Sequence, residues 1–179
     1  VDMMDFLSGK IEEDKDYISS GNMSIAPRFD VGDKDRAPVD DANTYPYSAI
    51  ALVEVVYTNG DVDYGTGFFI SRQTMLTAAH VLVEGNLQIE RVNVYKSCNG
   101  YATTPTAQAS GWYICADFDD DIVTDYDDDY AVLRFSSNVS QTWFGLYVPA
   151  NPADLLGNGR HVAGYPHDMC NRENHEFYM

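Results

Sequence analysis

The chain has 179 residues, of which 45% are apolar and 13% aromatic, so it is long and apolar enough to build one domain with a real core. Its 11 Lys and Arg side chains against 28 Asp and Glu give a formal net charge of −17, which repels phosphate backbones and anionic lipid surfaces. Nucleic acid and membrane are therefore excluded as expected partners.

The first 28 residues differ in character from the rest. A charge run covers residues 10–16, and Met3, Met4, Leu7 and Ile11 could line one face of a short helix. Residues 1–5 have neither the basic start nor the apolar stretch of a signal peptide, so we expect that any export signal has already been removed. We expect an appended segment over residues 1–28.

From Tyr47 onward, short apolar runs bounded by turn residues are typical of an all-β sandwich or barrel. Strands are expected over residues 48–57, 62–70 and 74–77, with turns at 58–61 and 71–73. The first turn contains Asn59-Gly60, a pair that accepts the positive φ angles of a tight hairpin. Further strands are expected at residues 91–95, 111–116, 130–135 and 161–165, and a short helix is the expectation at 151–156.

The strongest chemical signal is Leu76-Thr-Ala-Ala-His80-Val-Leu82, which follows the glycine-containing run Gly65-Thr-Gly-Phe-Phe-Ile70. We expect a strand to deliver the imidazole of His80 to the edge of a cleft, with small alanines allowing close packing and the glycines allowing a curved barrel wall. Histidine suits a general base because its pKa ordinarily lies near working pH. This pattern resembles the histidine motif of chymotrypsin-like serine proteases.

A second signal is the aspartate run 125–129, which immediately precedes the apolar segment Tyr130-Ala-Val-Leu-Arg-Phe135. It resembles the aspartate motif of the same proteases, in which the carboxylate holds the histidine tautomer and stabilises the imidazolium. Asp129 fits best because the strand starts directly after it. Asp128 and Asp127 are the register alternatives.

The flanks narrow the resemblance to the bacterial glutamyl endopeptidases, the V8-like group. The segments Val31-Gly-Asp-Lys-Asp-Arg-Ala-Pro-Val39, Tyr45-Pro-Tyr-Ser-Ala-Ile50 and Val162-Ala-Gly-Tyr-Pro166 resemble that group's mature N-terminus, first strand and Gly-Tyr-Pro turn. The order and spacing of all these motifs over residues 29–179 are more specific than any one of them. The resemblance implies an all-β, chymotrypsin-like double β-barrel.

The resemblance also implies a division of the chain. We expect a propeptide over residues 1–28 that is removed by cleavage between Arg28 and Phe29, and a first barrel over 29–150 that carries His80 and Asp129. Residues 151–179 would then be a linker and the opening strands of an incomplete second barrel. No Gly-x-Ser-Gly occurs in the sequence, so the serine nucleophile is expected downstream of residue 179.

The implied function is hydrolysis of protein or peptide substrates after Glu, or after Asp, by a secreted, extracellular enzyme of which this chain alone is inactive. The alternative is a catalytically inactive protease-like binding module. A Gly-x-Ser-Gly within about a hundred residues after Met179 would favour the enzyme, and a stop codon or a substituted serine would favour the module.

Cysteine and acidic residues give weaker expectations. Cys98, Cys115 and Cys170 have no C-x-x-C spacing, and one disulfide plus one leftover thiol is the simplest account in an oxidising compartment. Cys98 and Cys115 are the expected pair, and three separate, partly buried thiols are the alternative. The aspartates at 117–129 could hold Ca²⁺, but they lack the glycine and glutamate of an EF-hand loop. We expect a solvated acidic loop, no metal site and no cofactor, with Ca²⁺ as the alternative.

Overall fold

The computed structural model describes residues 38–118, 127–146, 162–166, 170–171 and 174–179, all of which belong to one compact unit over Pro38–Met179. The appended segment and its expected helix, the expected helix at 151–156, and the expected boundaries at residues 28 and 150 lie outside the described residues. No helix in the described part of the chain is long and apolar enough to cross a membrane.

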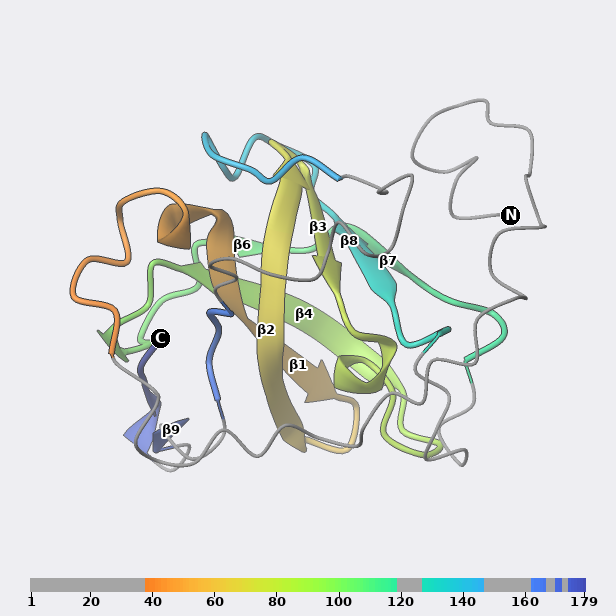
Figure 1. Ribbon diagram of the computed structural model, residues 1–179. Helices are drawn as coiled ribbons and strands as arrows, with labels where there is room; N and C mark the ends of the chain where they lie inside the picture. The colour runs from red at the N-terminus through yellow and green to blue at the C-terminus, as the bar shows by residue number, and fades with distance from the viewer. Residues whose placement is uncertain (1–37, 119–126, 147–161, 167–169, 172–173) are drawn as a thin grey trace, which may run out of the picture. The chain divides into compact units, whose positions relative to one another are not determined.

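One curled antiparallel sheet dominates the described unit (Figure 1). Its strand order is β6-β4-β1-β2-β3-β8-β7, and a second sheet has the order β5-β10-β9. The elements are η2 (Tyr47–Ala49), β1 (Ile50–Tyr57), β2 (Val62–Ser71), β3 (Thr74–Thr77), η3 (Ala79–Val81), β4 (Ile89–Lys96), β5 (Gly100–Tyr101), β6 (Ala107–Gln108), β7 (Gly111–Ile114), β8 (Ala131–Arg134), β9 (Cys170–Asn171) and β10 (Glu176–Phe177).

Strands β1, β2, β3, β4, β7 and β8 confirm six of the seven strands expected from the sequence. The seventh expectation, at 161–165, is wrong for the residues that are described there, because 162–166 form no strand. The expected turn at 58–61 is also confirmed. Gly60 has a φ of +91°, a left-handed conformation that glycine adopts at no steric cost.

Strand β1 is buried along its whole length because both of its faces are covered. Alternate residues Ala51, Val53, Val55 and Tyr57 enter the main core with Phe69, Val92, Val94 and Leu133. Ile50 and Leu52 point to the opposite face, where they pack with Tyr165, Phe177 and Met179 of the C-terminal segments. Such two-sided burial explains why the sequence of β1 is an almost continuous apolar run.

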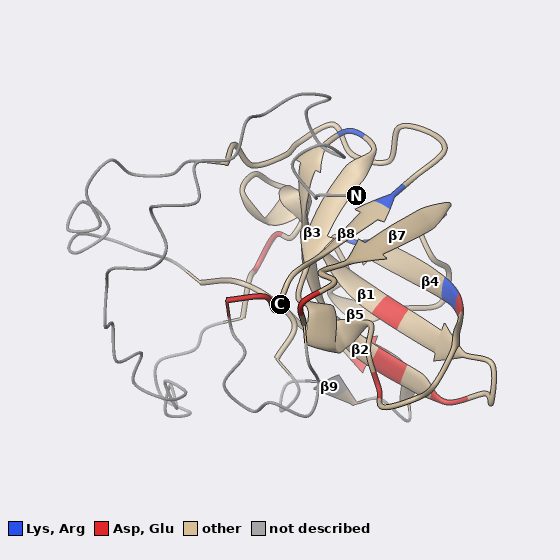
Figure 2. Ribbon diagram, turned by 90° about the vertical axis from the view of Figure 1, so that its right-hand side faces the viewer, with Lys and Arg blue, Asp and Glu red and all other residues tan. Residues whose placement is uncertain are grey.

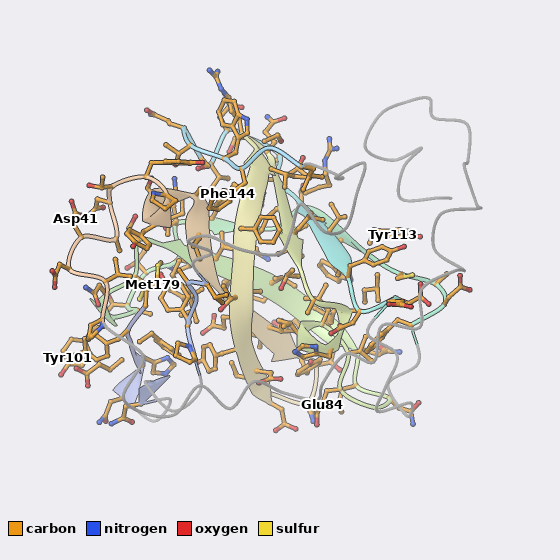
Figure 3. All side chains as sticks on the ribbon, in the orientation of Figure 1. Asp41, Glu84, Tyr101, Tyr113, Phe144 and Met179 are labelled. Carbon is orange, nitrogen blue, oxygen red and sulfur yellow. The ribbon has the colours of Figure 1, made fainter. Side chains whose placement is uncertain are left out.

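An aromatic layer, formed by Tyr45, Phe68 and Phe144, covers the outer face of β2. The Phe144 ring lies 5.8 Å from the Phe68 ring and 5.7 Å from the Tyr45 ring, measured between centroids. Figure 3 shows Phe144 beside one end of β2, whereas Glu84, which follows η3, lies at the other end. The aromatic layer is therefore remote from η3, where His80 lies.

Candidate active site

His80 lies on η3, the 3-residue 3-10 turn that follows β3, so the strand expected at 74–77 leads to the imidazole through this turn. Strand β3 ends at Thr77, whose Oγ1 donates a hydrogen bond to the carbonyl oxygen of Thr66 on β2 at 2.9 Å. Ala78 is extended, and its carbonyl oxygen accepts the Val81 N–H. This short turn carries the imidazole out of the sheet and leaves its side chain 62% exposed.

Gly65 on β2 lets η3 approach the sheet closely. A Cβ at this position would lie 2.5 Å and 2.6 Å from the two methyl carbons of Val81, the residue after His80. Gly67 is similar, because its Cβ would lie 2.5 Å from the Met75 sulfur. The glycines thus serve close packing between neighbouring elements, a more specific reason than the curved wall expected from the sequence.

Asp129 lies two residues before Ala131, the first residue of β8, and turns its carboxylate toward His80. Its Oδ1 accepts the His80 backbone N–H at 2.9 Å, and its Oδ2 lies 2.7 Å from His80 Nδ1. An ionised carboxylate can only accept, so in the neutral imidazole Nδ1 carries the proton of this bond and Nε2 keeps its lone pair. The Asp129 side chain is 17% exposed and therefore largely shielded from water.

The neighbouring aspartates do not compete for this place. Asp127 is exposed, and Asp128 Oδ1 accepts a hydrogen bond from the Cys115 thiol at 3.4 Å. Successive side chains before β8 point in different directions, so only Asp129 is hydrogen-bonded to His80 among the residues described here. The structure thus brings together the two residues that the sequence singled out.

The predicted disulfide between Cys98 and Cys115 is wrong. Cys115 is a free, buried thiol at the end of β7. The Cys98 sulfur lies in the second core cluster, where it is 3.7 Å from the Gly100 carbonyl oxygen. The two cysteines had no spacing signal to pair them, and in the fold Cys98 packs in the second core cluster whereas the Cys115 thiol donates to Asp128.

Among the described residues, no three His, Cys, Asp or Glu side chains lie close enough together to hold a metal ion. Much of the acidic loop considered for Ca²⁺, residues 119–126, lies outside the described part, as do Arg28 and Phe29 at the expected cleavage site. Figure 2 shows acidic positions distributed along the described ribbon, in keeping with the charge of −17.

The Gly-Tyr-Pro segment packs against the same strand that supports His80. The Tyr165 N–H donates to Thr66 Oγ1 at 2.8 Å, and a Cβ on Gly164 would lie 2.9 Å from that oxygen. Thr66 therefore contacts β3 through its backbone and the segment 162–166 through its side chain. Sequence reasoning missed this role because a threonine in a strand carries no local signal.

Comparisons with known proteins give one family, one curated relative and similar solved structures. The chain is 25% identical over 156 residues to the extracellular metalloprotease of Bacillus subtilis (strain 168), a match that covers 81% of this chain and 47% of that protein. The chain thus spans about half the length of the curated relative that it matches. The solved structure of HL collagenase matches with a TM-score of 0.45 and 18% identity, covering 58% of this chain and 43% of the collagenase.

The solved structure of GrC gives a TM-score of 0.44 and 18% identity, covering 65% of this chain and 47% of GrC. A family model described as Trypsin matches residues 39–176, which include the whole 7-stranded sheet and both His80 and Asp129. The chain therefore belongs to the trypsin family, and its all-β fold is of the chymotrypsin type.

Proposed function

We propose that the protein to which this chain belongs is a serine endopeptidase that hydrolyses protein or peptide substrates by acyl transfer. The observation that carries the proposal is the pair His80 and Asp129, joined at 2.7 Å within a trypsin-family domain. In this proposal Asp129 holds the proton on Nδ1. The free Nε2 then takes a proton from the nucleophile and returns it to the leaving amine.

The nucleophile is proposed to be a serine beyond residue 179. No Gly-x-Ser-Gly occurs in the 179 residues, and the matched relative is about twice as long as the stretch that this chain covers. The 179-residue chain alone should therefore be inactive. The alternative, an inactive protease-like binding module, is less favoured because the His–Asp pair keeps both hydrogen bonds.

Metal-dependent hydrolysis, which the name of the Bacillus relative states for that protein, does not fit the residues at this site. A catalytic zinc is held by three protein ligands, whereas the described site offers one imidazole and one carboxylate that are bonded to each other. Together with the word "extracellular" in the relative's name, the family match supports secretion as a further part of the proposal.

Specificity for Glu, or Asp, before the cleaved bond is the finer part of the proposal, and it is supported by the V8-like motifs. A chain of charge −17 repels acidic substrates at long range, so a local cation is needed. We propose that cleavage between Arg28 and Phe29 supplies it, because a new α-ammonium group is largely protonated at neutral pH, with a pKa of about 8. Residues 1–28 would then act as a propeptide that keeps the enzyme inactive.

Three measurements on the complete protein test this function. A phosphonate reagent that reacts covalently with activated serines should label one serine downstream of Met179, and His80→Ala should abolish labelling. Peptides that differ only in Glu, Asp, Gln or Arg before the scissile bond should show the highest kcat/KM for Glu. Hydrolysis by the isolated 179-residue chain, or an unlabelled and inactive complete protein, would contradict the proposal.

The maturation step has its own test. Arg28→Gln should keep residues 1–28 attached, as mass spectrometry would show, and should lower kcat/KM on the glutamyl peptide. Equal activity of the uncut and cut forms would exclude a role for the new N-terminus while leaving the peptidase function intact.

A further inference from the structure

Cys115 lies where strand β7 meets the loop that carries Asp129. It follows Ile114, the last residue of β7, and is 6% exposed. Its backbone N–H donates to the carbonyl oxygen of Tyr130 at 3.2 Å, and so extends the pairing of β7 with β8 beyond the strand ends. Cys115 is therefore fixed by the sheet, next to the residues that flank Asp129.

The Cys115 side chain contacts the residues on both sides of Asp129. Its thiol donates to Asp128 Oδ1 at 3.4 Å, and the Tyr130 side chain is hydrogen-bonded to Cys115. The bond to Cys115 and burial raise the pKa of Tyr130 above its usual value, so the phenol keeps its proton through neutral pH. The donor directions are thus consistent, from the Tyr130 hydroxyl to the sulfur and from the thiol to the carboxylate.

Within the described part of the chain, both hydrogen bonds of the Asp129 carboxylate go to His80. No other described side chain holds the carboxylate, so its direction depends on the backbone of residues 128–130. A local hydrogen bond from the Tyr130 N–H to the Asp128 carbonyl oxygen at 2.8 Å tightens this backbone, and the Cys115 contacts anchor it to β7.

We propose that Cys115 is a positioning residue that clamps Asp128 and Tyr130 and thereby aims the Asp129 carboxylate at His80. The assignment rests on the proposed function of His80 and Asp129. It gives this buried thiol a role other than the disulfide that the sequence suggested, and it requires no oxidation or metal binding.

The tautomer of His80 in the 179-residue chain tests the clamp directly. Long-range ¹H–¹⁵N spectra read the protonation of both ring nitrogens through carbon-bound protons, so solvent exchange at the exposed imidazole does not interfere. Wild type should show the Nδ1–H form. Cys115→Ala should lose that preference, whereas Cys115→Ser, which keeps a donor, should retain it.

Cys98→Ala is the matched control, since Cys98 is also buried, at 8% exposure, but packs in the second core cluster, to which neither Asp129 nor Tyr130 belongs. It should leave the His80 tautomer unchanged. If Cys115→Ala does not fold, Tyr130→Phe provides the decisive comparison, because it removes one arm of the clamp and keeps the ring. An unchanged His80 tautomer in the folded Cys115→Ala chain, or in Tyr130→Phe where Cys115→Ala does not fold, would overturn the proposal.

In the complete protein, Cys115→Ala should lower kcat by up to about 100-fold with KM within about twofold, because misaimed catalytic groups act on the chemical step. Cys115→Ser should recover most of this loss. An inactive wild-type protein would refute the peptidase function but not the clamp, which the tautomer measurement decides by itself. A kcat of Cys115→Ala equal to wild type would refute the catalytic consequence of the clamp.

Discussion

Replacing Gly65 by alanine should displace η3, the turn that carries His80, because the new methyl group would collide with Val81. The new Cβ would lie 2.5 Å from one methyl carbon of Val81 and 2.6 Å from the other, whereas carbon atoms in contact ordinarily lie about 3.5–4.0 Å apart. Val81, which is 5% exposed in the main core, must therefore move by roughly 1 Å. His80 precedes it on the same turn and must shift as well.

We expect this overpacking to lower the free energy of unfolding by about 1–3 kcal/mol. Urea denaturation monitored by far-ultraviolet circular dichroism measures this change in the 179-residue chain, and the His80 tautomer reports whether the bond to Asp129 survives. In the complete protein, a displacement of this size should reduce kcat by up to about 100-fold.

Two controls sharpen the test of Gly65→Ala. Gly111→Ala adds the same methyl group to β7, where a Cβ would meet nothing within 4 Å, and should change stability by no more than about 0.5 kcal/mol. Val81→Ala alone should cost about 2 kcal/mol, but combined with Gly65→Ala it should cost less than the sum, since the two changes share one space. Gly65→Ala as stable as wild type, with an unchanged His80 tautomer, would refute the steric reasoning.

Three further changes test other parts of the unit. In the complete protein, Asp129→Asn should lower kcat by about four orders of magnitude, the loss expected when the aspartate of a Ser-His-Asp triad becomes an amide and the histidine takes the wrong tautomer. Asp128→Asn should lower kcat by about tenfold or less, because the amide oxygen can still accept the Cys115 proton. A larger loss for Asp128→Asn than for Asp129→Asn would assign the catalytic aspartate to position 128. Burial and the nearby Glu54 carboxylate raise the pKa of Tyr95, so the unfolded chain loses this proton first and stability should fall as pH rises above 10.0. Tyr95→Phe should make the decline of the urea midpoint with pH shallower. An equal decline in Tyr95→Phe and wild type would exclude Tyr95 as the cause. Thr66→Val removes the hydroxyl oxygen that accepts the Tyr165 N–H, and so should speed hydrogen exchange of that amide, whereas Thr66→Ser should not. An exchange rate unaffected by Thr66→Val would contradict the contact.

Local pattern alone determined the main strands and the identity of the two site residues. Strand β3 has the expected bounds, residues 74–77, and the Asn59-Gly60 turn forms as predicted, because β-branched runs and positive-φ glycines act within a few residues. His80 and Asp129 were found because a motif places each of them beside a strand end. Their spacing of 49 residues carried no information about contact.

Tertiary structure decided how those residues meet and what supports them. The sheet order places β8 beside β3, so Asp129 reaches His80 with both carboxylate oxygens. The short strands β5, β6, β9 and β10 were missed because two residues are too few to show an alternating pattern, and β5 also pairs with β10, far away in the chain. Cys115 could not be assigned from sequence, because a buried thiol looks the same locally whether it forms a disulfide or donates to Asp128, and only the fold selects its partner.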